Sequence, residues 1–313
     1  MSGSDRTILV LGGTGLMGRE VLGALRRRGA DARVLVRDPA KLPYREGLDI
    51  RVGDLRDAAS LRAAVRGVDV VFAISPHEAD EVALMRAVVT ACERERARLV
   101  FAGIHVASPN PLAGWIARRM CELLMPRYRG KFAIGRMVER SATGPVILVP
   151  SNFMQNDEVL FGAIEGGLFV HPISEKGLNR VDLRDLGEIA ATVLLDAAFP
   201  TGRYPVVGPR SLTGPECARV WADALGHEVR YAGDDDAVLE AAIHEHVSGY
   251  RREDWMSSLR RLRTYGLPTS SADLAVTERM LGRPATPFEE FAWRVAGERA
   301  ADAAPAPLTE VVS

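Results

Sequence analysis

Glycines near the start of the chain have the spacing of loops that bind nucleotide phosphates. The segment fits G-x-G-x-x-G through Gly13, Gly15 and Gly18, and G-x-x-G-x-x-G through Gly12, Gly15 and Gly18. One glycine allows a tight turn, another lets backbone N–H groups approach a pyrophosphate, and the last lets the next helix pack closely on the preceding strand. The candidate pyrophosphate-binding residues are Gly12, Gly13, Thr14, Gly15, Leu16, Met17 and Gly18.

The flanks of this turn supply the context that the motif requires. Ile8–Leu11 is an uninterrupted apolar run, typical of a strand buried on both faces of a parallel sheet. The helix expected at 16–28 would direct its N-terminal dipole and free N–H groups at a bound anion. A glycine triplet alone is weak evidence, whereas strand, turn and helix together favour dinucleotide binding over a purely structural turn.

Arg37 and Asp38 stand at the end of the second expected strand, about 20 residues beyond the glycine turn, where cofactors are discriminated. An acidic side chain there accepts hydrogen bonds from the ribose of NAD, whereas a cation suits the 2′-phosphate of NADP. Arg37, with further positive charge from Lys41 and Arg19, favours NADP. Asp38 precedes a proline and is expected to cap a short helix at 39–42. The alternative for Arg37 is a solvated surface charge.

Strands and helices alternate strictly through the first half of the chain, with short linkers between them. This order is typical of a doubly wound parallel sheet, the Rossmann architecture of the α/β class. The expected strands are 8–11, 32–36, 49–52, 68–74, 98–104 and 146–149, and the expected helices are 16–28, 57–65, 78–94 and 131–141.

Residues that follow different strands of such a sheet share one rim, because ligands bind beyond the carboxyl ends of the strands. We expect Asp54 and Leu55, which follow the third strand, to lie beside the adenine. Ala73, Ile74 and Ser75, at the end of the fourth strand, are expected to flank the ribose.

The composition limits the classes of protein and partner. The 313 residues carry 40 basic and 41 acidic side chains, so the charge favours attraction to neither nucleic acid nor an anionic membrane. Cys92, Cys121 and Cys217 follow no metal-ligand spacing and are interpreted as reduced thiols. No stretch approaches the roughly 18 apolar residues of a membrane span, and residues 1–5 form no targeting segment. We therefore expect a cytoplasmic protein with a small-molecule partner and no metal.

The strict alternation loosens near residue 150, which suggests a second unit. We expect a cofactor-binding domain at 1–150 and a smaller substrate-covering lobe at 151–300 that is interleaved with the sheet. One helix at 152–164 is expected to cross the substrate cleft. The Ala/Pro-rich residues 301–313 predict a disordered tail.

Several segments together resemble the NmrA-like group of atypical short-chain dehydrogenases/reductases. In the first half these are GGTGLMGREV (12–21), LVRDPAK (35–41), GDLRD (53–57) and VDVVF (68–72). In the second half they are VPSNFMQN (149–156), VDLRDL (181–186), GPRSLT (208–213) and LGRPATPFEEF (281–291). The resemblance covers almost the whole chain and implies a Rossmann fold that binds NADP. It is specific for the family but not for a reaction.

Ordinary short-chain dehydrogenases carry catalytic groups that this chain lacks. They use a serine at the end of the fifth strand and a Tyr-x-x-x-Lys pair on the next helix, whose lysine lowers the pKa of the phenol. Here Ala102 and Gly103 stand at the serine position. Tyr128 precedes Lys131 by three residues instead of four, which keeps both nearly on one helix face, although Gly130 makes a continuous helix there doubtful.

Besides Tyr128, the remaining candidates for catalytic residues are Lys131 and His105. Lys131 matches a lysine that several NmrA-like reductases keep without the tyrosine, which implies that it holds the nicotinamide ribose and relays a proton. The alternative is a surface lysine at a helix start. His105 follows the fifth strand, and an imidazole with an ordinary pKa of about 6.5 could donate a proton or orient a carbonyl. The alternative is a buried histidine with satisfied hydrogen bonds.

The substrate side is expected to come from two segments. VPSNFMQN resembles the group's substrate loop, which implies that Asn152, Phe153, Gln155 and Asn156 line the substrate. Trp115 lies in an apolar helix expected at 112–125, which is either core or the wall of a pocket for a ring-shaped substrate.

Three functions are compatible with these residues. The first is an NADPH-dependent reductase of a small, mostly apolar carbonyl, enone or quinone, with secondary metabolism as one setting. The second is an NADP-binding redox sensor that regulates a partner without turnover. The third is a non-redox biosynthetic enzyme, such as a cyclase, on the same fold. The sequence leaves a monomer or a homodimer open.

Overall fold

The computed structural model describes residues 6–76, 78–104, 119, 128–244, 256, 259–260, 263–264, 266, 268 and 270–303. A seven-stranded sheet has the order β10-β6-β5-β4-β1-β2-β3, with every pairing parallel. Its strands are β1 (Ile8–Leu11), β2 (Ala32–Val36), β3 (Leu48–Val52), β4 (Val70–Ile74), β5 (Arg98–Ala102), β6 (Val146–Pro150) and β10 (Gly202–Val206). The doubly wound fold expected from the alternation is confirmed.

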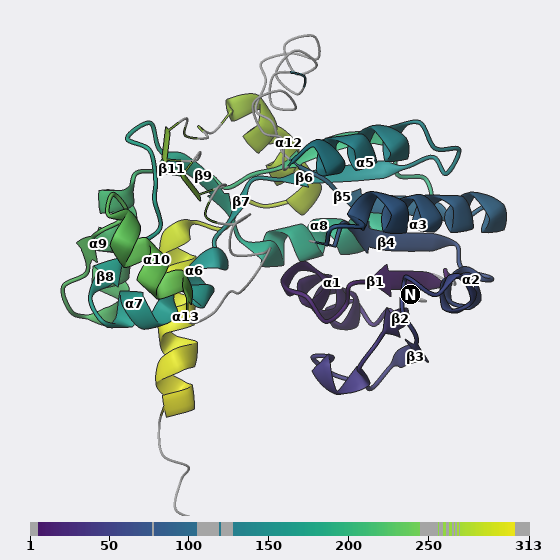
Figure 1. Ribbon diagram of the computed structural model, residues 1–313, viewed down its shortest axis with the longest axis horizontal. Helices are drawn as coiled ribbons and strands as arrows, with labels where there is room; N and C mark the ends of the chain where they lie inside the picture. The colour runs from purple at the N-terminus through teal and green to yellow at the C-terminus, as the bar shows by residue number, and fades with distance from the viewer. Residues whose placement is uncertain are drawn as a thin grey trace, which may run out of the picture.

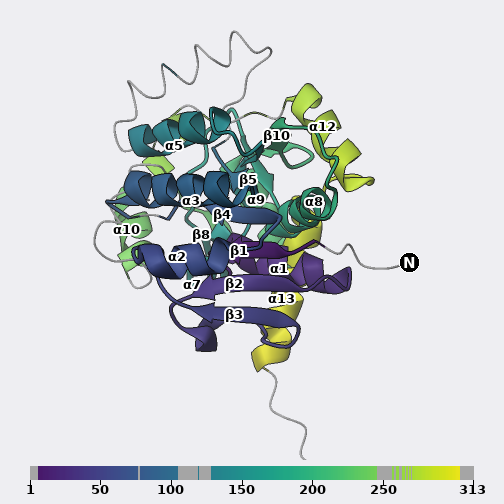
Figure 2. The ribbon, with the colours of Figure 1, turned by 90° about the vertical axis from the view of Figure 1, so that its right-hand side faces the viewer.

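Helices cover both faces of the sheet, as Figures 1 and 2 show. Ile8 and Val10 pack into the core under the first set of helices, whereas Leu9 and Leu11 pack under the second. This explains the continuous apolar strands, because neither face meets water. The first set is α1 (Leu16–Arg27) and α8 (Leu183–Leu195), and the second is α2 (Ala58–Val65), α3 (Glu81–Glu95) and α5 (Arg129–Glu139).

The strand order reverses at β1, which lies between β2 and β4. The chain leaves β1 toward β2 and β3, and then crosses back to β4 on the other side. In an open sheet of this kind the crevice for a ligand lies at this reversal, outside the carboxyl ends of the strands. The glycine turn follows β1 directly.

A smaller lobe lies beside the sheet (Figure 1). Its strands are β7 (Asn152–Phe153), β9 (Leu178–Val181) and β11 (Ser211–Leu212) in one sheet and β8 (Leu168–Phe169) with β12 (Arg230–Tyr231) in another. Its helices are α6 (Asn156–Val159), α7 (Phe161–Glu165), α9 (Gly214–Leu225), α10 (Asp236–His244) and α13 (Phe288–Ala303). α12 (Ser271–Leu281) packs instead on β10 and α8. The domain boundary at residue 150 stays a prediction.

A charged cluster lies inside the core of the lobe. The side chains of Asp157, Arg180 and His171 are at most 1% exposed. Arg180 donates to Asp157 at 2.8 and 2.6 Å, and Trp221 Nε1 donates to it at 3.0 Å. Burial would raise the pKa of Asp157, but the guanidinium outweighs burial and lowers this pKa to about 2. Burial also lowers the pKa of His171 below its ordinary value.

The prediction of a single helix at 152–164 is wrong. Asn152 and Phe153 pair in parallel with β9, and the chain then forms α6 and α7, which are separated at Leu160. A strand pairing with residues much later in the chain leaves no trace in local periodicity. At the C-terminal end, α13 continues through Ala303, so residues 301–303 are helical and do not belong to the disordered tail expected at 301–313. Residues 304–313 lie outside the described part.

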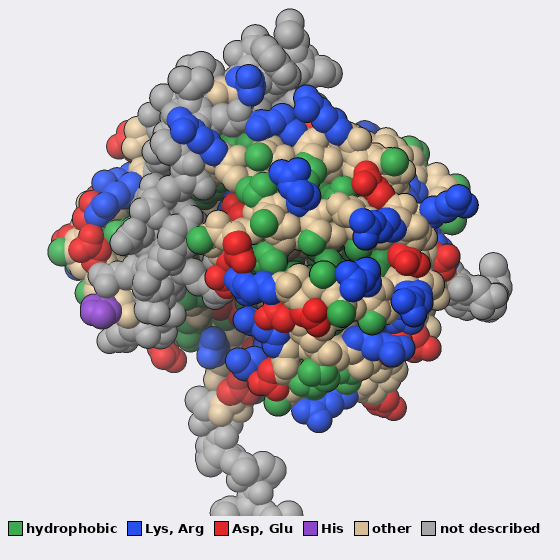
Figure 3. All heavy atoms as spheres, turned by 45° about the vertical axis from the view of Figure 1, so that its right-hand side comes forward, with side chains coloured by type: hydrophobic (Ala, Val, Ile, Leu, Met, Phe, Trp, Pro, Cys, Tyr) green, Lys and Arg blue, Asp and Glu red, His purple; other side chains and the backbone are tan. Residues whose placement is uncertain are grey.

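The described surface and cysteines agree with the composition. Figure 3 shows basic and acidic side chains interspersed over one face of the molecule. None of the described helices is long and apolar enough to cross a membrane. Cys92 and Cys217 are buried and unpaired, and burial raises the pKa of each thiol to about 12, so both are poor nucleophiles. Cys121 lies outside the described residues.

Candidate functional site

The glycine turn has a backbone path that only glycine permits at its two ends. Gly12 has φ +78°, in the left-handed region, and its carbonyl accepts a hydrogen bond from the Gly15 N–H at 2.9 Å. A Cβ atom on Gly18 would lie 2.1 Å from the same carbonyl oxygen. The turn and the first coil of α1 are therefore in direct backbone contact, which is the close packing expected of the third glycine of the motif.

The N-terminus of α1 is open to an anion. Gly15 is the N-cap residue and supplies no side chain to the free N–H groups of the first turn, which also contains no acidic residue. Leu16 is 47% exposed, so the start of the helix faces solvent. Free N–H groups and the helix dipole at such an end bind phosphate, and the turn fits a pyrophosphate.

Three basic side chains lie around the loops after β1 and β2. Arg19 Nε donates to the carbonyl of Thr14 at 3.1 Å, and its Nη2 donates to that of Lys41 at 3.2 Å, so it ties the glycine turn to the next loop. Arg37 and Lys41 are exposed. The carboxylate of Asp38 accepts from the Ala40 N–H at 2.9 Å, as expected for the cap of the short helix. Asp38 is therefore engaged with backbone, and the positive charge of this corner suits a phosphate.

The residues that follow β3 and β4 differ in what they can present to a ligand. Asp54 Oδ1 accepts from the Arg56 N–H at 2.9 Å, and Leu55 packs partly against the core. The side chain of Ala73 is completely buried, so only its backbone is available. Ile74 packs against the glycine turn, since its Cγ2 would lie 2.9 Å from a Cβ atom on Gly12.

Ser75 and Lys131 meet at an acid that the sequence reasoning missed. Glu81 Oε2 accepts from Ser75 Oγ at 2.8 Å and from Lys131 Nζ at 2.9 Å. The side chains of Lys131 and Glu81 are 11% and 12% exposed, so Lys131 is not the surface lysine of the alternative interpretation. Glu81 opens α3, where an acidic residue is ordinarily explained by the helix dipole, and this hid its partnership.

α5 begins before Lys131, which corrects the doubt about Gly130. The helix starts at Arg129 and contains Gly130 without interruption, and Tyr128 is its N-cap residue with helical backbone angles. Tyr128 and Lys131 are therefore three residues apart on a continuous helical path, nearly on one face. The phenol of Tyr128 is partly exposed.

In the loop after β6, some side chains are partly exposed to solvent and others are buried in hydrogen bonds. Asn152, Phe153 and Asn156 are partly exposed. Gln155 is buried, donating to Asp182 at 2.6 Å and accepting from the Leu183 N–H at 3.0 Å, so its amide holds the start of α8. The hydroxyl of Ser151 is buried and has no hydrogen-bond partner among the described residues. Such an orphaned group at the carboxyl end of a strand is available to a ligand.

His105 and Trp115 lie outside the described residues, as does most of the helix expected at 112–125. Among the described residues, no group of three His, Cys, Asp or Glu side chains could hold a metal ion.

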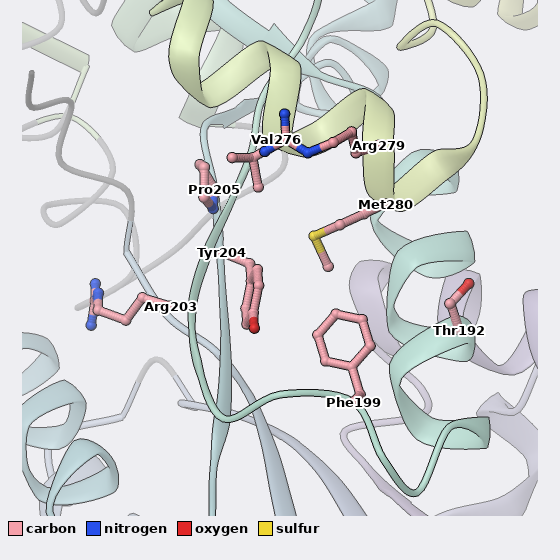
Figure 4. A pocket seen from close by; sticks show the side chains of 8 residues that line it. All are labelled: Thr192, Phe199, Arg203, Tyr204, Pro205, Val276, Arg279 and Met280. Atoms are coloured by element: carbon pink, nitrogen blue, oxygen red, sulfur yellow. The ribbon is translucent and has the colours of Figure 1, made fainter.

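A separate cavity of about 370 Å³ opens between α8, β10 and α12. Figure 4 shows Phe199 and Met280 pointing toward Tyr204. This cavity shares no residue with the glycine turn, the Ser75–Glu81–Lys131 cluster or the loop after β6. Its lining residues are Thr192, Phe199, Arg203, Tyr204, Pro205, Val276, Arg279 and Met280.

Comparison with known proteins gives consistent matches over most of the chain. The model of the NmrA-like family matches residues 4–253. An NAD(P)H azoreductase of Xenophilus azovorans is 32% identical over 91% of this chain and 96% of its own length. A (4-alkanoyl-5-oxo-2,5-dihydrofuran-3-yl)methyl phosphate reductase of Streptomyces griseus is 27% identical over 91% of this chain and 96% of its own. Among solved structures, the triphenylmethane reductase of Citrobacter sp. with NADP(H) has a TM-score of 0.74 at 19% identity, covering 93% of this chain and 100% of that one.

Proposed function

This chain belongs to the NmrA-like family, and we propose that it is an NADPH-dependent reductase of a small conjugated organic acceptor. The observation that carries the proposal is the glycine turn, where Gly12 and Gly18 are in backbone contact and the N-terminus of α1 is open. The azoreductase relative, whose name states its use of NAD(P)H, supports the same cofactor class.

The cofactor would lie along the rim of the sheet. The glycine turn would hold the pyrophosphate, and Arg37, Lys41 and Arg19 the 2′-phosphate. Asp54 and Leu55 would border the adenine. When bound, the reduced nicotinamide supplies the hydride.

The nicotinamide half would lie near the carboxyl end of β4 and the start of α5. The backbone of Ala73, with Ile74 and Ser75, would flank the ribose, and Lys131 would donate to a ribose hydroxyl. Tyr128 precedes Lys131 on the same helix, and His105 stays a candidate proton donor from the sequence alone.

The substrate side would be formed by the loop after β6. Asn152, Phe153 and Asn156 would contact the acceptor. The hydroxyl of Ser151, which has no partner in the described part of the chain, would offer the acceptor or the nicotinamide a hydrogen bond. Gln155 would act indirectly, because its amide is committed to the start of α8. Trp115 stays a proposed wall of this pocket.

The absence of the usual catalytic serine limits the class of acceptor that we propose. A simple ketone that accepts a hydride becomes an alkoxide, a strong base that needs a positioned acid as it forms. Ala102 and Gly103 carry no hydroxyl, so the position of the usual catalytic serine offers the carbonyl no such donor. A quinone, enone or azo group spreads the new negative charge over a conjugated system and then takes its proton from water. The names of the azo and dihydrofuranone relatives describe acceptors of this conjugated kind.

The test is a titration followed by turnover. NADPH and NADH are titrated into the purified protein, and a naphthoquinone, a cyclic enone, an azo dye and an unconjugated ketone are then supplied with NADPH. We expect preferential NADPH binding and consumption with a conjugated acceptor but not with the ketone. NADPH binding without consumption across the panel would favour the regulatory protein, and conversion without change of the cofactor would favour the non-redox enzyme. Folded protein that binds neither nucleotide would refute the proposal.

A further inference from the structure

Glu81 connects two elements that would otherwise contribute to the rim independently. It is the first residue of α3, and one of its oxygens, Oε2, accepts both the Ser75 hydroxyl and the Lys131 ammonium. Ser75 follows β4, and Lys131 lies in the first turn of α5. Figure 2 shows α3 and α5 side by side on one face of the sheet, and the two helices are in contact.

Gly130 makes this meeting possible. A Cβ atom at that position would lie 2.7 Å from Glu81 Oε1, closer than a side chain tolerates without movement. Gly130 is unfavourable for helix formation, but its lack of a side chain lets the start of α5 approach the Glu81 carboxylate.

Stability alone is a poor explanation of the pair. Ser75, Glu81 and Lys131 are largely withdrawn from water. Removing an ammonium and a carboxylate from water costs energy that their attraction often fails to repay, and well-packed apolar residues of similar size are commonly as stable. A charged pair in this position therefore calls for a second role.

The direction of the hydrogen bonds suggests that role. An ionised carboxylate can only accept, so the single hydroxyl proton of Ser75 is directed to Glu81 at 2.8 Å, with the Pro76 carbonyl farther away at 3.4 Å. Among the described residues, no donor contacts the lone pairs of this hydroxyl. The ammonium of Lys131 has three donors, of which Glu81 takes one. The cluster thus offers an outside ligand an acceptor at Ser75 beside a donor at Lys131.

We propose that Glu81 is a positioning residue that orients Ser75 and Lys131 as an acceptor and donor pair for the hydroxyls of the nicotinamide ribose. Each ribose hydroxyl both donates and accepts, so this pair complements a vicinal diol. The inference rests on the proposed function, because it takes the ribose of NADPH as the ligand.

The test is a double-mutant cycle on NADPH binding with Glu81→Gln, Lys131→Met and the double variant. We expect Lys131→Met to weaken NADPH about tenfold and Glu81→Gln about fivefold, as for charge-assisted hydrogen bonds. In the Lys131→Met background, Glu81→Gln should add less than about twofold, because an amide oxygen can still accept the Ser75 hydroxyl and the rest of the effect passes through the lysine. Adenosine 2′,5′-bisphosphate, which lacks the nicotinamide ribose, should bind all variants equally.

Glu139→Gln is the matched control, since Glu139 lies at the other end of α5 and pairs with Arg203 at 2.7 Å. It should leave NADPH affinity unchanged. Additive effects in the cycle, or equal weakening of NADPH and the bisphosphate by Glu81→Gln, would overturn the inference alone. A folded wild-type protein that binds no NADPH would overturn the proposed function together with it.

Discussion

Gly18 packs so closely on Gly12 that a Cβ atom on Gly18 would lie 2.1 Å from the Gly12 carbonyl oxygen. The obstacle is backbone, which cannot rotate away as a side chain can. The conformation of the turn and the position of α1 are therefore coupled, and the open N–H groups at the start of the helix depend on that coupling.

Replacing Gly18 with alanine should damage both binding and stability. The added methyl group must push α1 away from the turn, which we expect to cost about 1–3 kcal/mol of unfolding free energy and to abolish measurable NADPH binding. Gly23→Ala is the matched control on the same helix, since a Cβ there meets only the flexible Arg27 side chain at 3.4 Å. It should stabilise the protein by up to about 1 kcal/mol. Thermal unfolding and calorimetric titration measure both quantities, and normal NADPH binding by Gly18→Ala would refute the assigned role of the turn.

Arg37→Ala should change cofactor preference. Arg37 is exposed directly after β2, and the carboxylate of Asp38 accepts the Ala40 N–H, so we expect the guanidinium to be available to the proposed 2′-phosphate. Loss of a charge-assisted contact to phosphate should weaken NADPH about 10–100-fold while leaving NADH within about twofold. Arg45→Ala, an exposed arginine farther along the chain, serves as the control. Equal losses for NADPH and NADH would show that Arg37 does not read the phosphate.

Gly130→Ala tests the approach of α5 to Glu81 without changing any charge. The new Cβ would lie 2.7 Å from Glu81 Oε1, so we expect the carboxylate to shift and NADPH affinity to fall about threefold to tenfold. Gly135→Ala on the same helix has its nearest neighbour at 4.0 Å and should bind NADPH normally. Affinities measured by calorimetry should separate the two variants, and identical values would mean that the carboxylate position is unimportant.

The sequence predicted the first half of the molecule well because its signals are local. Continuous apolar strands, the glycine turn and the Asp38 cap each depend on neighbours a few residues apart. Glu81 escaped detection because an acid at a helix start has an ordinary explanation, and its partners come from β4 and α5. The strands β7 and β9 are short and pair across the lobe, so no periodicity marks them.

The buried cluster of Asp157, His171 and Arg180 should make stability depend on pH. Burial lowers the pKa of His171 in the folded state. As the pH falls below about 6.5, this histidine is therefore protonated in the unfolded chain but stays neutral in the folded protein. Stability is therefore fully present above that pH, and His171 should remove up to about 2 kcal/mol between pH 7 and pH 5. The Asp157 carboxyl, with its pKa lowered to about 2, adds a further loss only below about pH 4.

Chemical denaturation at pH 7, 6 and 5 measures this slope, and His171→Phe isolates its source. The phenyl ring cannot titrate and fills a similar space, so we expect the variant to lose most of the pH dependence between pH 7 and pH 5. His227→Gln is the control, because His227 is exposed and its loss should leave the slope unchanged. If the wild type and His171→Phe show the same slope, a group other than this buried imidazole governs the acid response.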